Sequence, residues 1–282
     1  MLKQITNGRI LTPEGWLEGG SVLVEGGKIV EVTNSQRPVA GAELIDAKGN
    51  DIVPGGIELH IHGGGGRDFM EGTEEACRVA VDAHMQYGTP AIYPTLSSST
   101  REMIDAAIKT CEKLMKEPGS PIMGLHLEGP YFNLNKAGAQ MPEIIRNPDP
   151  NEYKDILANT DCVKLWDAAP ELPGAKEFYE CCVEHGCKPS IAHTDGGWDD
   201  VVMAYKAGAN HATHFTNAMS SLSKAREFKK VGVVESVFAI PDFTVEVISD
   251  GIHVPPVLMK QIYYAKGVEH MCFVTDSLAC SA

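Results

Sequence analysis

The rhythm of hydrophobic and polar positions changes once along this chain, near residue 52. Before that point, short apolar runs such as GSVLVEGGKIVEV are separated by glycine and proline, which is typical of short β-strands. The segment EGGK at 25–28 favours a hairpin turn between two of them. We therefore expect residues 1–51 to form a small antiparallel β unit that precedes the main domain.

From residue 52 onward, short apolar segments alternate with amphipathic helical patterns. The candidate strands are eight in number and lie at 52–62, 90–96, 122–128, 163–168, 189–193, 211–215, 244–249 and 271–275. Such an alternation over about 230 residues predicts a (β/α)8 TIM-type barrel over 52–282, since this fold takes about 250 residues. An open doubly wound sheet is the alternative, but no GxGxxG follows the first strand, which disfavours a dinucleotide-binding version.

Helix boundaries also have local signals. Ser99 with Glu102 forms a capping box before MIDAAIKTCEKLM, and Asp149 with Pro150 gives a cap and a first-turn proline. Glycines follow three helical patterns as stop signals: Gly88, Gly186 and Gly208.

Composition limits the possible partners. The 282 residues carry a formal net charge of −14, which argues against nucleic acid or an anionic membrane as a partner. The sequence has no apolar run of membrane-spanning length and no signal-peptide pattern at its start, so we expect a cytoplasmic protein.

None of the eight cysteines forms a CxxC pair, so we interpret them as reduced core residues. A zinc site from Cys182 and Cys187 would lack a second pair.

Polar side chains gather where the predicted strands end, which is where a barrel builds its active site. Five of the eight strands end in a metal-type ligand or an acid: His60 and His62, Glu128, His193, His214, and Asp276. In a strand, His60 and His62 face the same side, because side chains alternate with period two. Imidazole with carboxylate suits Zn²⁺ or Fe²⁺ and suits metal-assisted hydrolysis.

Each of these residues also has a structural interpretation when taken alone. A strand histidine is often a packed core residue, Glu128 could cap the turn that the next two residues start, and Asp276 could open a helix. The joint pattern is much less expected by chance. His126 is interpreted as packed and hydrogen-bonded, and His211 as structural. Lys164 could be a carbamylated bridging lysine, but Glu128 already fills a bridging role.

Several longer motifs carry a family resemblance. They are HLEGPYFNLNKAGAQ at 126–140, AHTD at 192–195, THFTNAM at 213–219, DGIHV at 250–254 and VTDS at 274–277. Together they resemble the N-acetylglucosamine-6-phosphate deacetylase family of the amidohydrolase superfamily, over most of the chain. The resemblance implies Glu128, His193 and His214 as principal metal ligands, and His60 and His62 as the pair that holds a second ion in some members. The metal is expected to be one or two ions of Zn²⁺ or Fe²⁺.

The same resemblance implies the other site residues. Asp276 matches the catalytic aspartate, which takes the proton of the attacking water and gives it to the amine leaving group. The positions that match substrate contacts are Ala139, Gln140, Asn217, Ala218, Arg226 and His253. Gln140 stands where other members carry histidine, and SSLSKA before Arg226 departs from the usual proline-containing stretch. Arg226 and the backbone N–H groups of 217–218 would bind phosphate, and His253 would stabilise the oxyanion.

The family builds its phosphate site across a subunit interface, so the resemblance also implies a homodimer. Its members continue beyond the position of Ala282 with a last helix and with strands that return to the small β unit. We therefore expect a C-terminally truncated chain: an incomplete β-sandwich domain at 1–51 and a barrel at 52–282 that lacks its last helix. The expected reaction yields glucosamine 6-phosphate and acetate.

Three alternatives remain at this point. The galactosamine epimer could be the substrate, since the sequence does not separate an axial from an equatorial hydroxyl. Another amidohydrolase activity, on a cyclic amide or a deaminated base, is disfavoured by Arg226 and by the lack of a convincing carboxylated lysine. The chain could also be a non-catalytic, metal-binding barrel fragment, which the truncation would favour.

Overall fold

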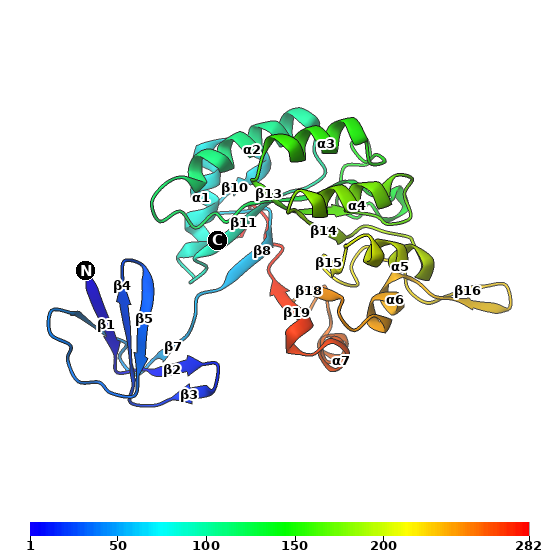
Figure 1. The fold of residues 1–282 in the computed structure, drawn as a ribbon. Helices are drawn as coiled ribbons and strands as arrows, with labels where there is room; N and C mark the ends of the chain where they lie inside the picture. Colours follow the sequence, from blue (N-terminus) through cyan, green and yellow to red (C-terminus); the bar gives the residue numbers. More distant parts are fainter. Residues whose placement is uncertain (282) are drawn as a thin grey trace. The chain divides into compact units, whose positions relative to one another are not determined.

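A computed structural model describes residues 1–281 and divides the chain into two compact units, with the boundary between residues 56 and 57. The N-terminal unit has two sheets (Figure 1). One has the strand order β5-β4-β1-β6 and the other β3-β2-β7. The strands are β1 (Leu2–Thr6), β2 (Arg9–Thr12), β3 (Gly15–Leu17), β4 (Ser21–Glu25), β5 (Lys28–Thr33), β6 (Glu43–Asp46) and β7 (Asp51–Ile52).

The predicted turn at EGGK is confirmed, because it joins the antiparallel strands β4 and β5. Gly26 and Gly27 have φ of 58° and 79°, the left-handed pair that a tight hairpin turn requires. We expected a purely antiparallel unit, and this is wrong in part. Strand β1 pairs in parallel with β6, and β2 pairs in parallel with β7. The long connection after β5 allows β6 to return in the same direction as β1.

The second unit is built on eight parallel strands, in the order β19-β18-β15-β14-β13-β12-β11-β8 (Figure 1). They are β8 (Ile57–Ile61), β11 (Ala91–Leu96), β12 (Leu125–Tyr131), β13 (Val163–Ala168), β14 (Lys188–Ile191), β15 (His211–Ala212), β18 (Thr244–Ile248) and β19 (Met271–Val274). A parallel bridge between Ile61 and Ser277 joins the two ends of the sheet, so the strands form a nearly closed barrel. The predicted barrel is confirmed, and the open doubly wound alternative is wrong.

All eight predicted strands are present, with shifted bounds. The segment predicted at 52–62 divides into β7, in the small unit, and β8, in the barrel. The third strand begins later than predicted and continues past Glu128 to Tyr131. Gly124, with φ of 155°, turns the chain just before this strand, and Ile122 makes only an isolated bridge to Ile92.

Helices follow the barrel strands and pack outside them. They are α1 (Glu74–Met85), α2 (Arg101–Met115), α3 (Pro150–Asn159), α4 (Ala175–Glu184), α5 (Trp198–Lys206), α6 (Val233–Ala239) and α7 (Pro256–Lys266). Short 3₁₀ turns lie at η1 (Phe69–Glu71), η2 (Leu134–Lys136) and η3 (Val268–His270), and two hairpins at β9 (Gly63–Gly64) with β10 (Arg67–Asp68) and β16 (Ser223–Ala225) with β17 (Phe228–Lys230). Among residues 1–281, none of these helices is long and apolar enough to cross a membrane.

The predicted helix caps are partly confirmed. The Asp149 side chain accepts the backbone N–H of Asn151 at 2.9 Å, as the N-cap of α3. The predicted cap of α2 is one residue off: Thr100 is its N-cap, because the Ser99 hydroxyl donates instead to the carbonyl of Ser97 at 2.7 Å. The predicted stop glycines all adopt left-handed φ: Gly88, Gly186 and Gly208.

The core of the barrel unit lies between strands and helices. Tyr131 stacks on Trp166 with ring centroids 5.7 Å apart, and Phe178 of α4 packs edge-on against both. Burying three such rings anchors α4 on β12 and β13. All eight cysteines are free thiols and six are buried, as the sequence predicted. Cys272 is partly buried and Cys280 is exposed.

Candidate active site

Six side chains that the sequence singled out converge at the C-terminal ends of the barrel strands. They form two groups, and within each group the potential ligand atoms lie within 4.8 Å of one another. The first group is His60, His62 and Asp276, and the second is Glu128, His193 and His214. The five His and Glu side chains are buried, while the Asp276 side chain keeps 23% of its surface exposed.

The first group is assembled where the barrel closes. His60 lies in β8 and His62 just after it, and the Nε2 atoms of the two rings are 3.2 Å apart. The backbone N–H of Asp276 donates to the carbonyl of His60 at 3.1 Å, which brings the end of β19 to the end of β8. The Asp276 Oδ1 then lies 3.2 Å from Nε2 of His62 and 3.5 Å from Nε2 of His60.

The second group is centred on Glu128, which lies in the middle of β12. Its Oε1 is 3.0 Å from Nε2 of His193 and 3.0 Å from Nε2 of His214. Both histidines follow short strands in left-handed backbone conformations, with φ of 44° and 33°. Asp276 has φ of 49°, so three of the six residues adopt a strained conformation of the kind that clusters at functional sites.

Glu128 also links the two groups. Its Oε2 lies 3.4 Å from Nε2 of His62, and its Oε1 lies 3.9 Å from Nε2 of His60. One carboxylate therefore faces all four imidazoles. This arrangement suits a single ion at the second group and equally suits a pair of ions that share Glu128.

The donor chemistry of the cluster fits a bound cation. Nδ1 of His193 lies 2.7 Å from the carbonyl oxygen of Lys136, which can only accept a hydrogen bond, so this nitrogen carries a proton. In the neutral ring, Nε2 of His193 then carries a lone pair. This atom faces Nε2 of His214 at 3.1 Å and Oε1 of Glu128 at 3.0 Å. Lone pairs this close repel one another unless a proton or a metal ion lies between them.

The charges of the cluster depend on one another. Burial works against ionisation of Glu128, but hydrogen bonds with His193 and His214 hold its pKa well below its ordinary value. Burial also works against protonation of His214, yet the hydrogen bond and the charge of Glu128 raise the pKa of this imidazole to about 9. For Asp276, burial is outweighed by the hydrogen bond with His62 and the charge of His60, which lower its pKa to about 2.

Comparison with known proteins agrees with this geometry. The sequence profile of the amidohydrolase family matches residues 52–280. The chain belongs to the amidohydrolase family. Members of this family are metal-dependent hydrolases of C–N amide bonds, so the chain is such a hydrolase and the cluster is its candidate metal centre.

Individual relatives are more specific. The chain is 31% identical over 262 residues to an N-acetylglucosamine-6-phosphate deacetylase of Haemophilus influenzae. This match covers 92% of the chain and 67% of that protein. It is also 31% identical over 229 residues to an N-acetylgalactosamine-6-phosphate deacetylase of Shewanella sp., which covers 81% of this chain and 57% of that protein. The chain thus spans about two thirds, or less, of these relatives' length.

Solved structures share the fold. The N-acetylglucosamine-6-phosphate deacetylase of Pasteurella multocida matches with a TM-score of 0.92 at 29% identity, over 99% of this chain and 72% of that one. A mutant of the Mycobacterium smegmatis enzyme, solved in complex with N-acetyl-D-glucosamine-6-phosphate, matches with a TM-score of 0.87 at 27% identity. That match covers 98% of this chain and 71% of the other.

Gln140 of this amidohydrolase contacts the metal centre directly. Its side-chain amide donates to Oε2 of Glu128 at 2.6 Å, and its carbonyl accepts the backbone N–H of Ser98 at 2.6 Å. The side chain is buried, whereas Ala139 beside it is exposed. The structure places Gln140 against the Glu128 carboxylate, and its expected contact with substrate stays a prediction.

The turn after His214 has its own backbone hydrogen bonds. The backbone N–H of Asn217 donates to the carbonyl of His214 at 2.9 Å, and its expected contact with phosphate stays a prediction. Ala218 has φ of 52°, and its carbonyl accepts the backbone N–H of Thr194 at 3.0 Å. The turn therefore ties the loop after β15 to the loop after β14, next to His193.

Two further predicted substrate residues lie outside the six-residue cluster. Arg226 is exposed at the turn of the β16–β17 hairpin, with φ of 56°. His253 is exposed, and its Nδ1 lies 2.7 Å from the carboxylate of Asp250. The six clustered residues are thus brought together by the barrel alone, while these two lie on loops beyond it.

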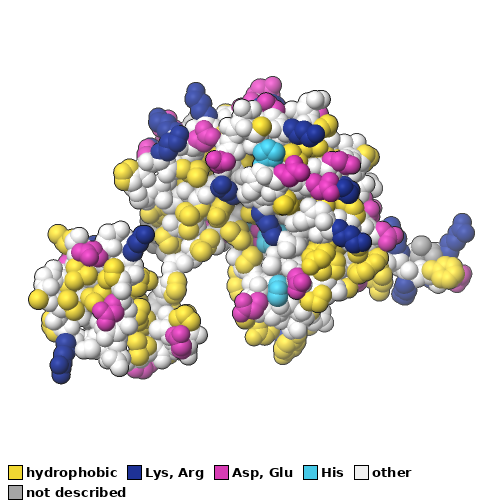
Figure 2. Space-filling model, viewed as in Figure 1, with side chains coloured by type: hydrophobic (Ala, Val, Ile, Leu, Met, Phe, Trp, Pro, Cys, Tyr) yellow, Lys and Arg dark blue, Asp and Glu magenta, His cyan; other side chains and the backbone are white. Residues whose placement is uncertain are grey.

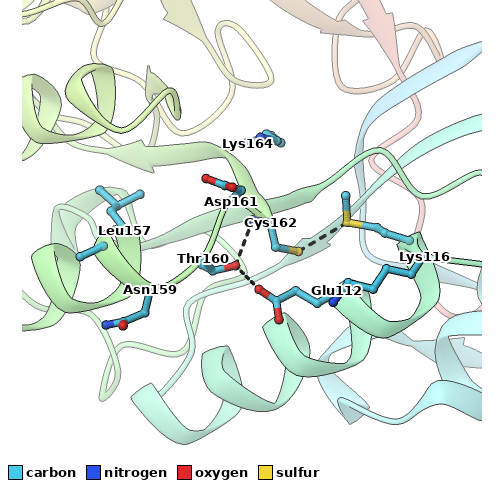
Figure 3. A pocket seen from close by; sticks show the side chains of 10 residues that line it. Glu112, Lys116, Leu157, Asn159, Thr160, Asp161, Cys162 and Lys164 are labelled. Atoms are coloured by element: carbon cyan, nitrogen blue, oxygen red, sulfur yellow. Dashed lines mark hydrogen bonds between the residues drawn. The ribbon is translucent and has the colours of Figure 1, made fainter.

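Lys164 is not part of the metal centre. It lies near the start of β13, at the opposite end of that strand from the cluster, and lines a cavity of about 610 Å³ (Figure 3). Glu112 of α2, Asn159 of α3 and Asp161 line the same cavity. A bridging role for Lys164 is therefore wrong, because barrel active sites form at the other end of the strands.

Buried carboxylates inside the barrel were not predicted from the sequence. Asp167 lies 3.0 Å from Nε2 of His126, which agrees with the packed role expected for that histidine. Glu246 lies in hydrogen-bond contact with His60 and His211. The available signal was an acid in the middle of an apolar strand, as in VKLWDA and TVEVI, since burying an unpaired carboxylate is costly.

Proposed function

We propose that this amidohydrolase removes the acetyl group from N-acetyl-D-glucosamine 6-phosphate and releases glucosamine 6-phosphate and acetate. The observation that carries the proposal is the pair of ligand groups that share Glu128 at the barrel mouth. The names of the relatives and the substrate complex of the Mycobacterium smegmatis enzyme support this choice of substrate.

Glu128, His193 and His214 would hold the principal metal ion, and His60 and His62 would hold a second. Mixed imidazole and carboxylate ligands favour Zn²⁺ or Fe²⁺. Such an ion, when bound, makes water more acidic and polarises the acetamide carbonyl. The protein's part is to keep the Nε2 lone pairs of these rings directed at one place, as the contact from His193 to the Lys136 carbonyl does.

Asp276 is suited to move the proton of the reaction. It is the most exposed of the six side chains, and its low pKa keeps it ionised and able to accept a proton. In the proposed reaction it takes one proton from the attacking water and returns it to the nitrogen as the C–N bond breaks, so the amine leaves neutral. Glu128 is not available for this task, because His193, His214 and Gln140 already occupy its two oxygens.

The phosphate group would be held by basic side chains of the β16–β17 hairpin. The β16–β17 hairpin carries Lys224, Arg226, Lys229 and Lys230, in a chain whose net charge is −14. Basic side chains are visible on this hairpin, which projects from the barrel unit (Figure 1 and Figure 2). Because Arg226 lies away from the six clustered residues, we infer that it serves the active site of a second subunit, in a homodimer. Its guanidinium offers two parallel donors to phosphate.

The assay that tests the proposal measures amine release from N-acetylglucosamine 6-phosphate by the zinc-loaded and the iron-loaded protein. We expect turnover that a chelator abolishes and added metal restores. N-acetylgalactosamine 6-phosphate is the second candidate substrate, because one relative of equal identity carries that name. A protein that binds metal and turns over neither sugar would be a non-catalytic barrel, and the proposal would be wrong.

Three other expectations stay predictions. The homodimer is tested by light scattering, and its interface should bury more than about 1,200 Å² in total. The cytoplasmic location suits the eight free thiols. Stabilisation of the oxyanion by His253 would require this exposed side chain to leave Asp250 and turn toward the mouth.

A further inference from the structure

Glu246 lies in the middle of β18, where the sequence TVEVI places it between two valines that are fully buried outside the barrel wall. Side chains alternate along a strand, so Glu246 points into the barrel interior. Its own exposure is 0%. Removing a carboxylate from water costs several kcal/mol unless it is paired, so its partners reveal what it is there to hold.

These partners include one residue from each metal-ligand group. Oε2 of Glu246 lies 3.2 Å from Nδ1 of His60 and accepts the backbone N–H of His214, also at 3.2 Å. Oε1 lies 3.0 Å from Nε2 of His211. The backbone carbonyl of Glu246 accepts the N–H of Phe215 at 2.8 Å. A single residue therefore touches one ligand of each group.

The contact with His60 decides which nitrogen of that ring is free. Oε2 of Glu246 already accepts the backbone N–H of His214, and Oε1 lies within hydrogen-bond distance of His211. A carboxylate with these partners acts as an acceptor, so the shared hydrogen lies on Nδ1 of His60. In the neutral ring this leaves Nε2 as a lone pair, and Nε2 is the atom that faces His62 and Asp276.

The contact with His214 acts on the backbone instead. His214 has φ of 33°, a strained conformation that persists only where its surroundings impose it. Glu246 accepts the N–H of His214 through its side chain and the next N–H through its carbonyl. Within residues 1–281, Nδ1 of His214 has no hydrogen-bond partner of its own. The orientation of the ring therefore depends on the two backbone hydrogen bonds to Glu246.

We propose that Glu246 is a positioning residue that couples the two metal-ligand groups: it fixes the tautomer of His60 and the backbone turn that presents His214. The inference rests on the proposed metal-dependent function. His211, whose Nδ1 lies 2.7 Å from Oγ1 of Thr244, steadies the carboxylate from its other side.

The variant that tests this inference is Glu246→Gln. The glutamine amide keeps one acceptor oxygen and replaces the other by an NH₂ group. This NH₂ group would face nitrogen atoms of His60, His211 or His214 that now contact a carboxylate oxygen. Donation from that NH₂ to Nδ1 of His60 would move the ring proton to Nε2 and remove the lone pair. Asp167→Asn is the matched control, because Asp167 is also fully buried inside the barrel but contacts His126 and Thr213, not one of the six clustered residues.

Metal-free protein is titrated with Zn²⁺ by calorimetry and with Co²⁺ by its visible absorption, and the melting temperature without metal checks the fold. We expect Glu246→Gln to bind metal about 10–100-fold more weakly than wild type, as is usual when such a supporting carboxylate is lost. Asp167→Asn should stay within about threefold of wild type. Equal binding by wild type and Glu246→Gln, or an equal loss in Asp167→Asn, would overturn the inference.

Two further outcomes separate the inference from the proposed function. Wild-type protein that binds no metal would refute the proposed function, whatever the variant does. If Glu246→Gln does not fold, long-range ¹H–¹⁵N spectra of zinc-loaded wild type give the answer, with His60 identified by its loss in His60→Asn. The proton is expected on Nδ1 of His60, and its presence on Nε2 would overturn the inference.

Discussion

Replacing Asp276 by asparagine separates an enzyme from an inert metal-binding barrel. Asparagine keeps the shape of the side chain and can still accept a hydrogen bond at the position 3.2 Å from Nε2 of His62. It cannot take up the proton of the attacking water. We therefore expect a large loss of turnover with little change in folding.

The structure sets the size of this loss, because the other carboxylate that faces His62 is already engaged. Glu128 is buried, and its two oxygens are in contact with His193, His214 and Gln140. The full general acid–base contribution should therefore disappear, a factor of about 10²–10⁴. At about 1.36 kcal/mol for each tenfold change, this is about 2.7–5.4 kcal/mol of transition-state stabilisation.

The assay is steady-state amine release from N-acetylglucosamine 6-phosphate by zinc-loaded Asp276→Asn and wild type. Metal bound by the Glu128 group, measured by elemental analysis, should be retained. Asp161→Asn, the same charge change on an exposed residue at the opposite end of the barrel, should leave turnover unchanged. An Asp276→Asn variant with more than about a tenth of wild-type turnover would refute the assignment, since it would have lost less than about 1.4 kcal/mol.

Three other changes have defined outcomes. Arg226→Met should raise KM for the phosphorylated sugar with little effect on kcat, and leave activity on unphosphorylated N-acetylglucosamine unchanged; equal effects on both substrates would argue against a phosphate contact. Gln140→Leu leaves the backbone N–H of Ser98 and one oxygen of Glu128 without their partner, so urea denaturation should show a loss of about 1–3 kcal/mol; an unchanged midpoint would contradict this. Burial lowers the pKa of Lys266 to about 8 from its ordinary 10.5, so the unfolded chain holds this proton more tightly and the free energy of unfolding should rise from about pH 8 to about pH 10.5. Lys266→Met should flatten that rise in urea denaturation series, and an unchanged slope would assign it to other groups.

Much of this fold follows from local pattern. Apolar segments that alternate with amphipathic helices are visible in the sequence because each element has its own periodicity. Parallel strands in a barrel share one C-terminal mouth, so residues at their ends must meet even when they are far apart in the chain. For this reason His60, His62, His193, His214 and Asp276 could be grouped from the order of strands and helices alone, and the cluster confirms that they lie together.

Other features depended on three-dimensional contacts. Glu128 was expected to end its strand, yet β12 continues to Tyr131, and only the curvature of the barrel brings this mid-strand side chain to both ligand groups. Gln140 was expected near substrate from its motif, and its hydrogen bond with Glu128 became visible only when the loop after β12 was seen to fold back toward the cluster.

Glu246 shows the limit of sequence reasoning most clearly. His60 and Glu246 are 186 positions apart, and their strands are not neighbours in the sheet order. An acid in an apolar strand indicates that some partner exists, because an unpaired buried charge is too costly. Which partner it has is decided by the interior of a closed barrel, where non-adjacent strands face one another across the axis. Strand and helix periodicity is thus sufficient to predict the barrel and the residues that gather at its mouth. The orientation of those side chains depends on contacts across the closed barrel, which no local pattern contains.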